Sequence, residues 1–332
     1  MRNQVVRVRR DQGLTESTKT TVRYICRSAD DLIAAVTTRL FNTLYGNGES
    51  VLDRDWDNLL LYDACRYDEF LKIAPVPNSD VRKRVTVGSQ TPEFLRRTFD
   101  GKTCHDTEYV TANPQPLKYA VERDDTPFHA IISLLKYWDE ETQPIHPEDV
   151  FEAVVSAAED YPDKRLIVHF LQPHAPFLGE TAGQIREQTG KTIGGLDPGR
   201  EYTNVESQSI ETTSYPGMLR SHPEVTISDI RDAYRETLAI TTNYVFDLAE
   251  KLDGKSVITS DHGELLGERL HPLGIRRWEH PEGIRSSELC FVPWVEYPWD
   301  ARKSIISEPP AQQSNINEQR VNNRLQSLGY IE

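Results

Sequence analysis

The chain of 332 residues has few residues of several kinds, and each scarcity excludes a class of protein. It contains only four cysteines, with no CxxC pair among them, so neither a zinc ribbon nor a dithiol redox motif is indicated. We expect buried thiols instead. No run approaches the roughly 18 apolar residues of a membrane-spanning helix, and no apolar stretch follows the N-terminal MRNQVVRVRR, so no secretory signal is visible. These absences predict a cytoplasmic protein.

Positive charge is scarce as well. The chain has 38 Lys and Arg against 52 Asp and Glu, a formal net charge of −14, and only 11 of the basic residues are lysine. Nucleic acids bind basic surfaces, so we exclude them as the main partner. An acidic, lysine-poor surface stays hydrated in concentrated salt, which suggests adaptation to a saline environment.

Residues 1–50 form a peripheral segment that begins basic and continues into an amphipathic pattern over 28–46, SADDLIAAVTTRLFNTLYG. Ser28 or Asp30 would cap the start of this helix, and Gly46 would end it. The few Lys and Arg in this stretch favour a helix that packs on the main domain. Weak association with a membrane surface or with another protein is the alternative.

The main domain, residues 51–308, alternates between two kinds of pattern. Short apolar runs typical of buried strands occupy 58–63, 165–172, 256–261 and 289–297, and helical periodicity occupies 147–161 and 229–252. Strands that alternate with helices predict an α/β fold with a mostly parallel sheet.

Two further segments are expected to lie outside this alternation. Residues 178–224 are rich in Gly, Thr, Ser and Pro and are interpreted as a loop insertion that forms a lid or a substrate wall. Residues 309–332 are polar, and we expect an exposed tail with a short helix.

Polar side chains follow three of the apolar runs at the point where each run ends. Asp63 follows the first, Gln172 and His174 follow the second, and Asp261 and His262 follow the third. A single Asp-His pair is usually a polar turn. Ligands of open α/β sheets, however, bind at the carboxyl ends of strands, where carboxylates and imidazoles together favour a divalent metal ion.

The stretch VTVGSQTPEFLRRTF, residues 85–99, supplies hydroxyl groups near a helix start. VTV is strand-like, and Pro92 suits the first position of a helix. Ser89 and Thr91 would then lie at a helix N-terminus, which favours an anion such as phosphate or sulfate. Either hydroxyl could act as a nucleophile when a metal lowers its pKa. The alternative is that Thr91 only caps the helix.

Four motifs, NLLLYDACRYD, GSQTPEFLRRTF, HFLQPHAPF and TSDHGELLGE, occur in this order over residues 58–268. Together they resemble the alkaline phosphatase/sulfatase superfamily. The resemblance implies an alkaline-phosphatase-like α/β sandwich, with helices on both faces of one central sheet. It also implies a metal-dependent enzyme that cleaves or transfers a phosphate or sulfate ester.

The resemblance assigns roles to individual positions. It makes Ser89 the nucleophile, with Thr91 as the alternative, and it places His174 against the substrate or leaving group. The implied metal ligands are Asp63, Asp261 and His262, with His271 or His280 completing the site if they are not simply polar loop residues. Substrate contacts are expected from Arg66, whose alternative role is a salt bridge to Asp68 or Glu69, and from Gln172. Glu264 and Glu268 are expected to cap and orient the turn after the Asp-His pair.

The departures from the superfamily pattern narrow the expected activity. The chain has no C-x-P-x-R motif, so the oxidised cysteine nucleophile of sulfatases is missing, and it has no D-x-x-x-H ligand pair near its middle. The pattern therefore favours one divalent ion (Mn, Zn or Ca) in a phosphotransferase or phosphodiesterase that acts on a small-molecule, glycan-linked or lipid-linked ester. Two alternatives are a two-metal phosphomonoesterase or mutase and a non-catalytic binding protein that retains the fold.

Overall fold

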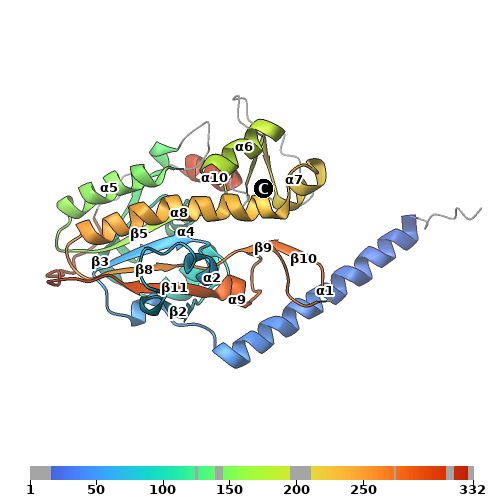
Figure 1. Ribbon diagram of the computed structural model, residues 1–332. Helices are drawn as coiled ribbons and strands as arrows, with labels where there is room; N and C mark the ends of the chain where they lie inside the picture. The colour runs from blue at the N-terminus through green and yellow to red at the C-terminus, as the bar shows by residue number, and fades with distance from the viewer. Residues whose placement is uncertain are drawn as a thin grey trace, which may run out of the picture.

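A seven-stranded sheet forms the centre of the protein (Figure 1). The computed structural model describes residues 16–123, 126–138, 145–194, 211–272, 274–311 and 318–327, with the backbone alone at 16–29, 211, 320, 326 and 327. The strands run in the order β2-β11-β8-β1-β5-β3-β4. Their bounds are β1 Asn58–Asp63, β2 Arg82–Val85, β3 Cys104–Thr111, β4 Phe128–Ser133, β5 Arg165–Pro173, β8 Ser256–Ser260 and β11 Phe291–Glu296.

The central strand β1 is buried on both faces, because successive side chains of a strand point to opposite sides. Leu60 and Tyr62 enter one core, which helices α5 (Pro147–Asp160) and α8 (Ile227–Lys251) cover. Leu59 and Leu61 enter a second core, together with Phe94 of α3 (Thr91–Phe99) and with α4 (Gln115–Val121). The predicted α/β fold, with helices on both faces of a mostly parallel sheet, is therefore confirmed.

The remaining elements lie around this sandwich and are short. They are η1 Val51–Asp53, α2 Tyr67–Phe70, η2 Asn78–Asp80, η3 Leu135–Tyr137, α6 Glu180–Thr189, β6 Lys191–Ile193, β7 Glu211–Thr213, α7 Tyr215–Ser221, β9 Leu265–Arg269, β10 Arg276–Glu279, α9 Ser287–Cys290 and α10 Glu318–Ser327.

Strand β11 runs antiparallel to β8, because the β9–β10 hairpin and α9 return the chain to the sheet from the end at which β8 left it, without a crossover helix. Two expectations about the other elements were wrong. The stretch 178–224 is not a plain loop, since its described part contains α6, β6, β7 and α7. The C-terminal helix is not fully exposed, because Val321 and Leu325 are buried.

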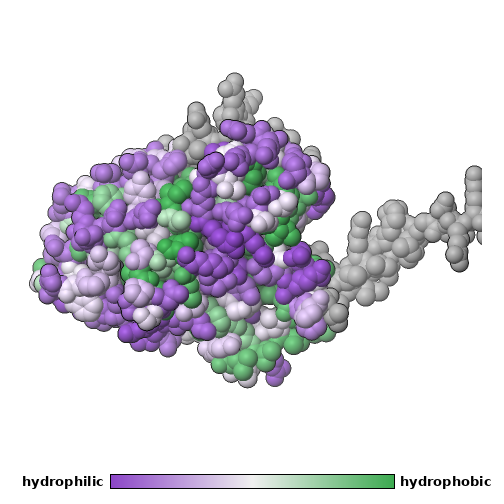
Figure 2. All heavy atoms as spheres, in the orientation of Figure 1, coloured by the Kyte–Doolittle hydropathy of each residue, from purple (hydrophilic) through white to green (hydrophobic). Residues whose placement is uncertain are grey.

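The N-terminal helix α1 spans Glu16–Tyr45 and therefore starts well before the predicted caps. Asp30 lies inside the helix and forms an ion pair with Arg277 of β10. The predicted end is confirmed, since Gly46 follows with a φ of +76°. Figure 1 shows α1 running along and beyond the edge of the domain. The face in Figure 2 is largely hydrophilic, in keeping with the acidic composition.

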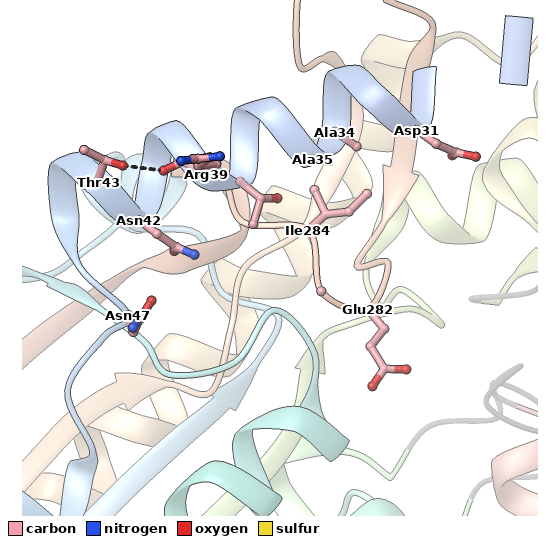
Figure 3. Close-up of a pocket in the computed structure, with 11 residues that line it drawn as sticks. Asp31, Ala34, Ala35, Arg39, Asn42, Thr43, Asn47, Glu282 and Ile284 are labelled. Carbon is pink, nitrogen blue, oxygen red and sulfur yellow. Dashed lines mark hydrogen bonds between the residues drawn. The ribbon is translucent and has the colours of Figure 1, made fainter. Parts of the chain in front are cut away.

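A groove of about 790 Å³ separates α1 from the loop at residues 282–284 (Figure 3). Ala34 and Thr38 line it from the helix, and Ile284 lines it from the loop. None of the helices in the described part of the chain is both long enough and apolar enough to cross a bilayer.

The short helix α2, which follows β1, is tied to α8 by a buried carboxylate. Glu69 accepts hydrogen bonds from Arg235 of α8 and from Lys72, at 2.7 and 2.9 Å. Burial alone would raise the pKa of Glu69, but these two cations outweigh it and lower the pKa to about 2. The ion pairs of Glu69 fix α2, which closely follows Asp63 in the chain, against α8, the longest helix of the main domain.

We predict that Glu69→Gln destabilises the protein at pH 7 by about 1–2 kcal/mol, a figure reduced because solvent screens the partly exposed Arg235 and Lys72. The pKa of this carboxyl is about 4.3 when the chain is unfolded and about 2 when it is folded. Its contribution is therefore complete above about pH 4.3 and disappears as the pH falls through about 2. Urea unfolding at pH 7 and pH 3 measures this. If the difference in free energy of unfolding between the parent and Glu69→Gln is larger at pH 3 than at pH 7, the ion pairs of Glu69 do not stabilise the protein in this way.

Candidate metal centre and active site

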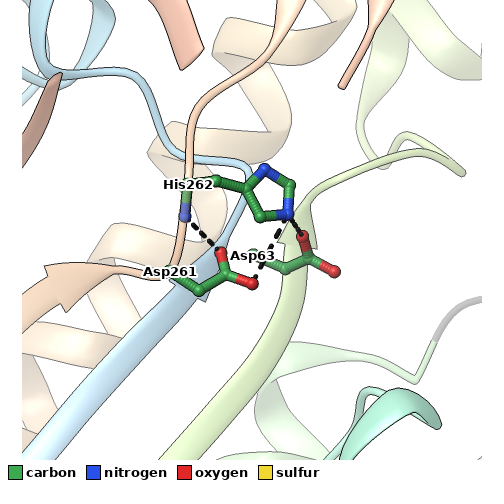
Figure 4. A group of neighbouring side chains, drawn as sticks. All are labelled: Asp63, Asp261 and His262. Carbon is green, nitrogen blue, oxygen red and sulfur yellow. Dashed lines mark hydrogen bonds and ion pairs between the residues drawn. The ribbon is translucent and has the colours of Figure 1, made fainter. Parts of the chain in front are cut away.

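Three side chains that the sequence analysis selected meet at one edge of the sheet (Figure 4). Asp63 ends β1, and Asp261 and His262 directly follow β8, its neighbour in the sheet. All three are fully buried. Among the residues that the structure describes, they are the one group of His, Cys, Asp and Glu with ligand atoms close enough to hold a metal ion.

The spacing of the three ligand atoms fits a single ion. Atoms bound to one tetrahedral ion at about 2.0–2.1 Å lie about 3.3 Å from one another. His262 Nε2 lies 3.2 Å from Asp63 Oδ1 and 3.4 Å from Asp261 Oδ2. Two carboxylates and one imidazole are also a donor set that suits zinc or manganese.

The chain orients each carboxylate through its other oxygen. Asn113, just after β3, donates from Nδ2 to Asp63 Oδ2 at 2.7 Å. Asp261 Oδ1 accepts from the backbone N–H groups of His262 and Ala64, at 2.7 and 3.2 Å. One oxygen of each acid therefore remains directed toward His262, and hydrogen bonds of this kind orient metal ligands and tune their affinity.

The tautomer of His262 also fits a metal ligand. Its Nδ1 lies 2.8 Å from the Gly263 carbonyl oxygen, to which only an N–H can donate, so Nε2 faces the carboxylates. Burial disfavours charge on this ring, but Asp261 and Asp63 outweigh it and raise the pKa of His262 to about 9. Burial would likewise raise the pKa of Asp261, but His262 and His169 lower it well below its usual range. The site thus demands a positive charge at Nε2, which either a proton or a metal ion supplies.

Thr91 completes this cluster, and Ser89 does not. Thr91 Oγ1 lies 2.8 Å from Asp261 Oδ2 and 3.2 Å from His262 Nε2. Ser89 Oγ instead lies 2.9 Å from Glu93 Oε2 and 3.3 Å from the Pro281 carbonyl oxygen. The resemblance to the superfamily thus placed the nucleophile at Ser89, two residues before the hydroxyl that reaches the cluster.

The reading of Thr91 as a simple helix cap is also wrong. Gln90 occupies the N-cap position, and Thr91 is the first residue of α3. Its side chain is therefore available to the carboxylate and the imidazole. The VTV segment was expected to be a strand, but β2 ends at Val85, so residues 86–90 form the turn that delivers Thr91.

Two more histidines lie beside the cluster. The ring of His280 is 4.6 Å from that of His262 and 5.0 Å from that of His174, between centroids. His280 Nδ1 lies 2.9 Å from Glu264 Oε2, so Glu264 orients a histidine and does not merely cap a turn. Burial lowers the pKa of His280 despite this carboxylate.

The other predicted site residues lie outside the cluster. Arg66 is bound bidentately by Asp68, at 2.8 and 2.9 Å, and by Glu268 at 2.7 Å, which matches the salt-bridge alternative. Gln172 donates to the Ile145 carbonyl oxygen. His271 is exposed in the turn between β9 and β10.

Asn113 and His169 escaped the sequence analysis. Asn113 was missed because strand β3 was not predicted, although the sequence VTANP has the same pattern of a strand followed by a polar residue. His169 lies within an apolar run, on β5, and faces Asp261 Oδ2 at 3.5 Å, while its Nδ1 lies 2.8 Å from the Tyr109 hydroxyl. The sequence offered one sign that His169 belongs to the site: it is a single histidine inside an apolar run.

Close backbone packing explains why Gly263 follows the Asp-His pair. A Cβ at this position would meet the Glu288 carbonyl oxygen at 2.0 Å, and the Gly263 N–H donates to the Leu289 carbonyl oxygen. Ala64, after Asp63, has a φ of +65°, a strained conformation for a residue with a side chain. It directs the Ala64 N–H at Asp261.

A scan of protein-family models and a search of curated proteins found no match to this chain. Solved structures are similar to it. The soluble domain of lipooligosaccharide phosphoethanolamine transferase A from Neisseria meningitidis is 12% identical, with a TM-score of 0.43, over 72% of this chain and 75% of that chain. The C-terminal periplasmic domain of EcEptC from Escherichia coli, in complex with Zn, is 13% identical, with a TM-score of 0.43, over 78% and 76%.

A protein in the alkaline phosphatase superfamily from Vibrio parahaemolyticus is 12% identical, with a TM-score of 0.37, over 90% of this chain and 75% of that chain. The four sequence motifs resemble the same superfamily. At so low an identity, the function has to be judged from the side chains of the site itself.

We predict that Asn113→Ala lowers the affinity for Zn²⁺ by about 10- to 100-fold, because Asp63 loses the donor that orients it. Competition with a chromogenic chelator measures the affinity. Asn78→Ala, an exposed change of the same type, serves as the control and should leave it unchanged. Equal affinities for both variants would show that Asn113 does not orient a metal ligand.

Proposed function

We propose that the protein is a metal-dependent enzyme that transfers or hydrolyses a phosphate ester through Thr91 and a covalent phospho-threonine intermediate. The observation that carries this proposal is the position of Thr91 Oγ1, within 3.2 Å of both Asp261 Oδ2 and His262 Nε2. A hydroxyl at the N-terminus of a nine-residue helix, beside a cluster of metal-ligand type, is poised for nucleophilic attack on a bound oxyanion.

In this proposal Asp63, Asp261 and His262 hold one divalent ion. Zinc or manganese suits their mixed oxygen and nitrogen donors better than calcium, which takes six to eight oxygen ligands. When bound, such an ion lowers the pKa of a nearby hydroxyl and stabilises negative charge on a phosphoryl group.

The chain's own residues then carry the two half-reactions. Thr91 Oγ1 forms the bond to phosphorus as the bond from phosphorus to the leaving oxygen breaks. Thr91 releases its proton to solvent, and the leaving oxygen gains one from His174. A water molecule or an acceptor hydroxyl next gives a proton to His280 and attacks phosphorus. The phosphorus–Oγ1 bond breaks, and Oγ1 takes a proton from solvent. His280 then passes its proton to His174, whose ring lies 5.0 Å away between centroids, so that both histidines return to their starting states.

Three features support the assignment of His280 to proton transfer. Glu264 fixes its Nδ1, so any exchange with a substrate uses Nε2. Burial lowers the pKa of His280, which favours the neutral ring that can accept a proton. His280 also packs against the ring of His262, 4.6 Å away between centroids.

A phosphate ester is the preferred substrate class, because the hydroxyl at the centre belongs to a threonine and not to an oxidised cysteine. The ester would be a small molecule or linked to a glycan or lipid. A second ion bound by His271 and His280 is not favoured, since His271 is exposed in a turn. The non-catalytic alternative predicts a purified protein that holds no ion, whereas the enzyme should contain about one Zn or Mn per chain.

Replacement of Thr91 tests the proposal most simply. Thr91→Ala should lower the rate of aryl phosphate mono- or diester hydrolysis in the presence of Zn²⁺ or Mn²⁺ by about a thousandfold or more, since the nucleophile is lost. Thr91→Ser should retain part of the activity. Mass spectrometry of the quenched enzyme should find phosphate on the peptide that contains Thr91.

Ser89→Ala is the matched control, because it removes a buried hydroxyl from the same turn. We expect this variant to keep activity within about tenfold of the parent. Loss of activity in Ser89→Ala, with Thr91→Ala active, would assign the nucleophile to Ser89 and overturn the proposal.

A further inference from the structure

Helix α1 carries a row of exposed apolar side chains, here called the outer stripe. It consists of Leu32, Val36, Leu40 and Leu44, which are 57–65% exposed. Four residues apart, they cover an arc of about 120° on one side of the helix. With the adjacent Tyr45, they make up half of the ten large apolar side chains that are exposed in the described part of the chain.

A different face of α1 attaches the helix to the domain. Ala34 and Phe41 are buried, and Phe41 contacts Phe291 of β11 at 5.3 Å between ring centroids. Thr38 Oγ1 accepts a hydrogen bond from the Arg285 N–H. Figure 2 shows the resulting apolar surface at the lower edge of the molecule, over the C-terminal half of α1.

Positive charge is concentrated in the N-terminal part of the chain, whereas the chain as a whole is acidic. Residues 1–27 carry seven basic residues and two acidic ones, a net charge of +5, although the whole chain has a net charge of −14. The basic residues are Arg2, Arg7, Arg9, Arg10, Lys19, Arg23 and Arg27. A basic segment that leads into an exposed apolar stripe is the combination that binds anionic lipid surfaces.

We propose that the outer stripe is a docking surface for an anionic membrane, in which the stripe enters the acyl chains and the net positive charge of residues 1–27 favours anionic headgroups. A second copy of this chain fits less well, because each copy has a net charge of −14 and the two copies repel each other. Nucleic acid would attract the basic segment and leave the stripe exposed to water. The proposal does not depend on the reaction at Thr91.

The attachment of α1 would also hold the active site near that surface. Arg285 donates through its backbone N–H to Thr38 of α1 and through its guanidinium group to the carbonyl oxygens of Thr86 and Val87, at 2.8 and 3.0 Å. These two residues begin the turn that delivers Thr91.

Vesicle flotation with the full chain tests the docking surface. Vesicles of phosphatidylcholine with an equal part of phosphatidylglycerol should bind the protein, and pure phosphatidylcholine should bind it much less. Leu40→Gln/Leu44→Gln should weaken binding by about tenfold or more, since glutamine keeps the helix propensity and removes the apolar surface. Arg9→Gln/Arg10→Gln should weaken binding to the anionic vesicles alone.

Val121→Gln/Ile306→Gln is the matched control, because it removes two exposed apolar side chains far from the stripe in sequence; binding should not change. Circular dichroism and thermal unfolding of all variants ensure that each is folded. Equal binding by the stripe variant and the parent would overturn the proposal. A second contrary result is a parent protein that does not bind vesicles but forms concentration-dependent dimers, measured by light scattering, which the stripe substitutions abolish. The stripe would then be an interface between two copies of the chain. Nucleic acid binding with no vesicle binding would also refute it.

Discussion

Two buried carboxylates face one imidazole nitrogen at the end of the central sheet, and the rest of the site depends on the positive charge that this arrangement requires. Asp63 and Asp261 are fully buried and repel each other, and His262 offers them Nε2 because its Nδ1 is bound to a carbonyl oxygen. A divalent ion satisfies all three groups at once. The hydrogen bonds from Asn113 and from two backbone N–H groups are then devices that hold each acid in one orientation.

The fold meets this requirement by placing distant parts of the chain in adjacent strands. Strands β1 and β8 are almost two hundred residues apart in sequence, yet they pair in parallel over Asn58–Tyr62. The acids at their carboxyl ends are therefore brought together by backbone hydrogen bonds within two apolar cores. The strained Ala64 and the close approach at Gly263 are local costs of this convergence.

Much of the site was readable from sequence because parallel strands end in polar residues at one edge. This rule selected Asp63, Asp261 and His262 correctly as neighbours. It could not separate Ser89 from Thr91, because which hydroxyl faces the cluster depends on a turn whose shape is set by tertiary packing. It also missed Asn113, whose strand has too few uninterrupted apolar residues. The compartment and the adaptation to salt are properties beyond the fold, and the expectations about them from composition stay predictions.

The most direct test of a metal centre at Asp63, Asp261 and His262 is an anomalous diffraction measurement at the zinc absorption edge, on crystals of the purified protein supplied with Zn²⁺. We predict one peak about 2.0–2.2 Å from Asp63 Oδ1, Asp261 Oδ2 and His262 Nε2, with Thr91 Oγ1 beside it. Peaks confined to exposed residues such as His271, with none at the end of β1 and β8, would contradict the account.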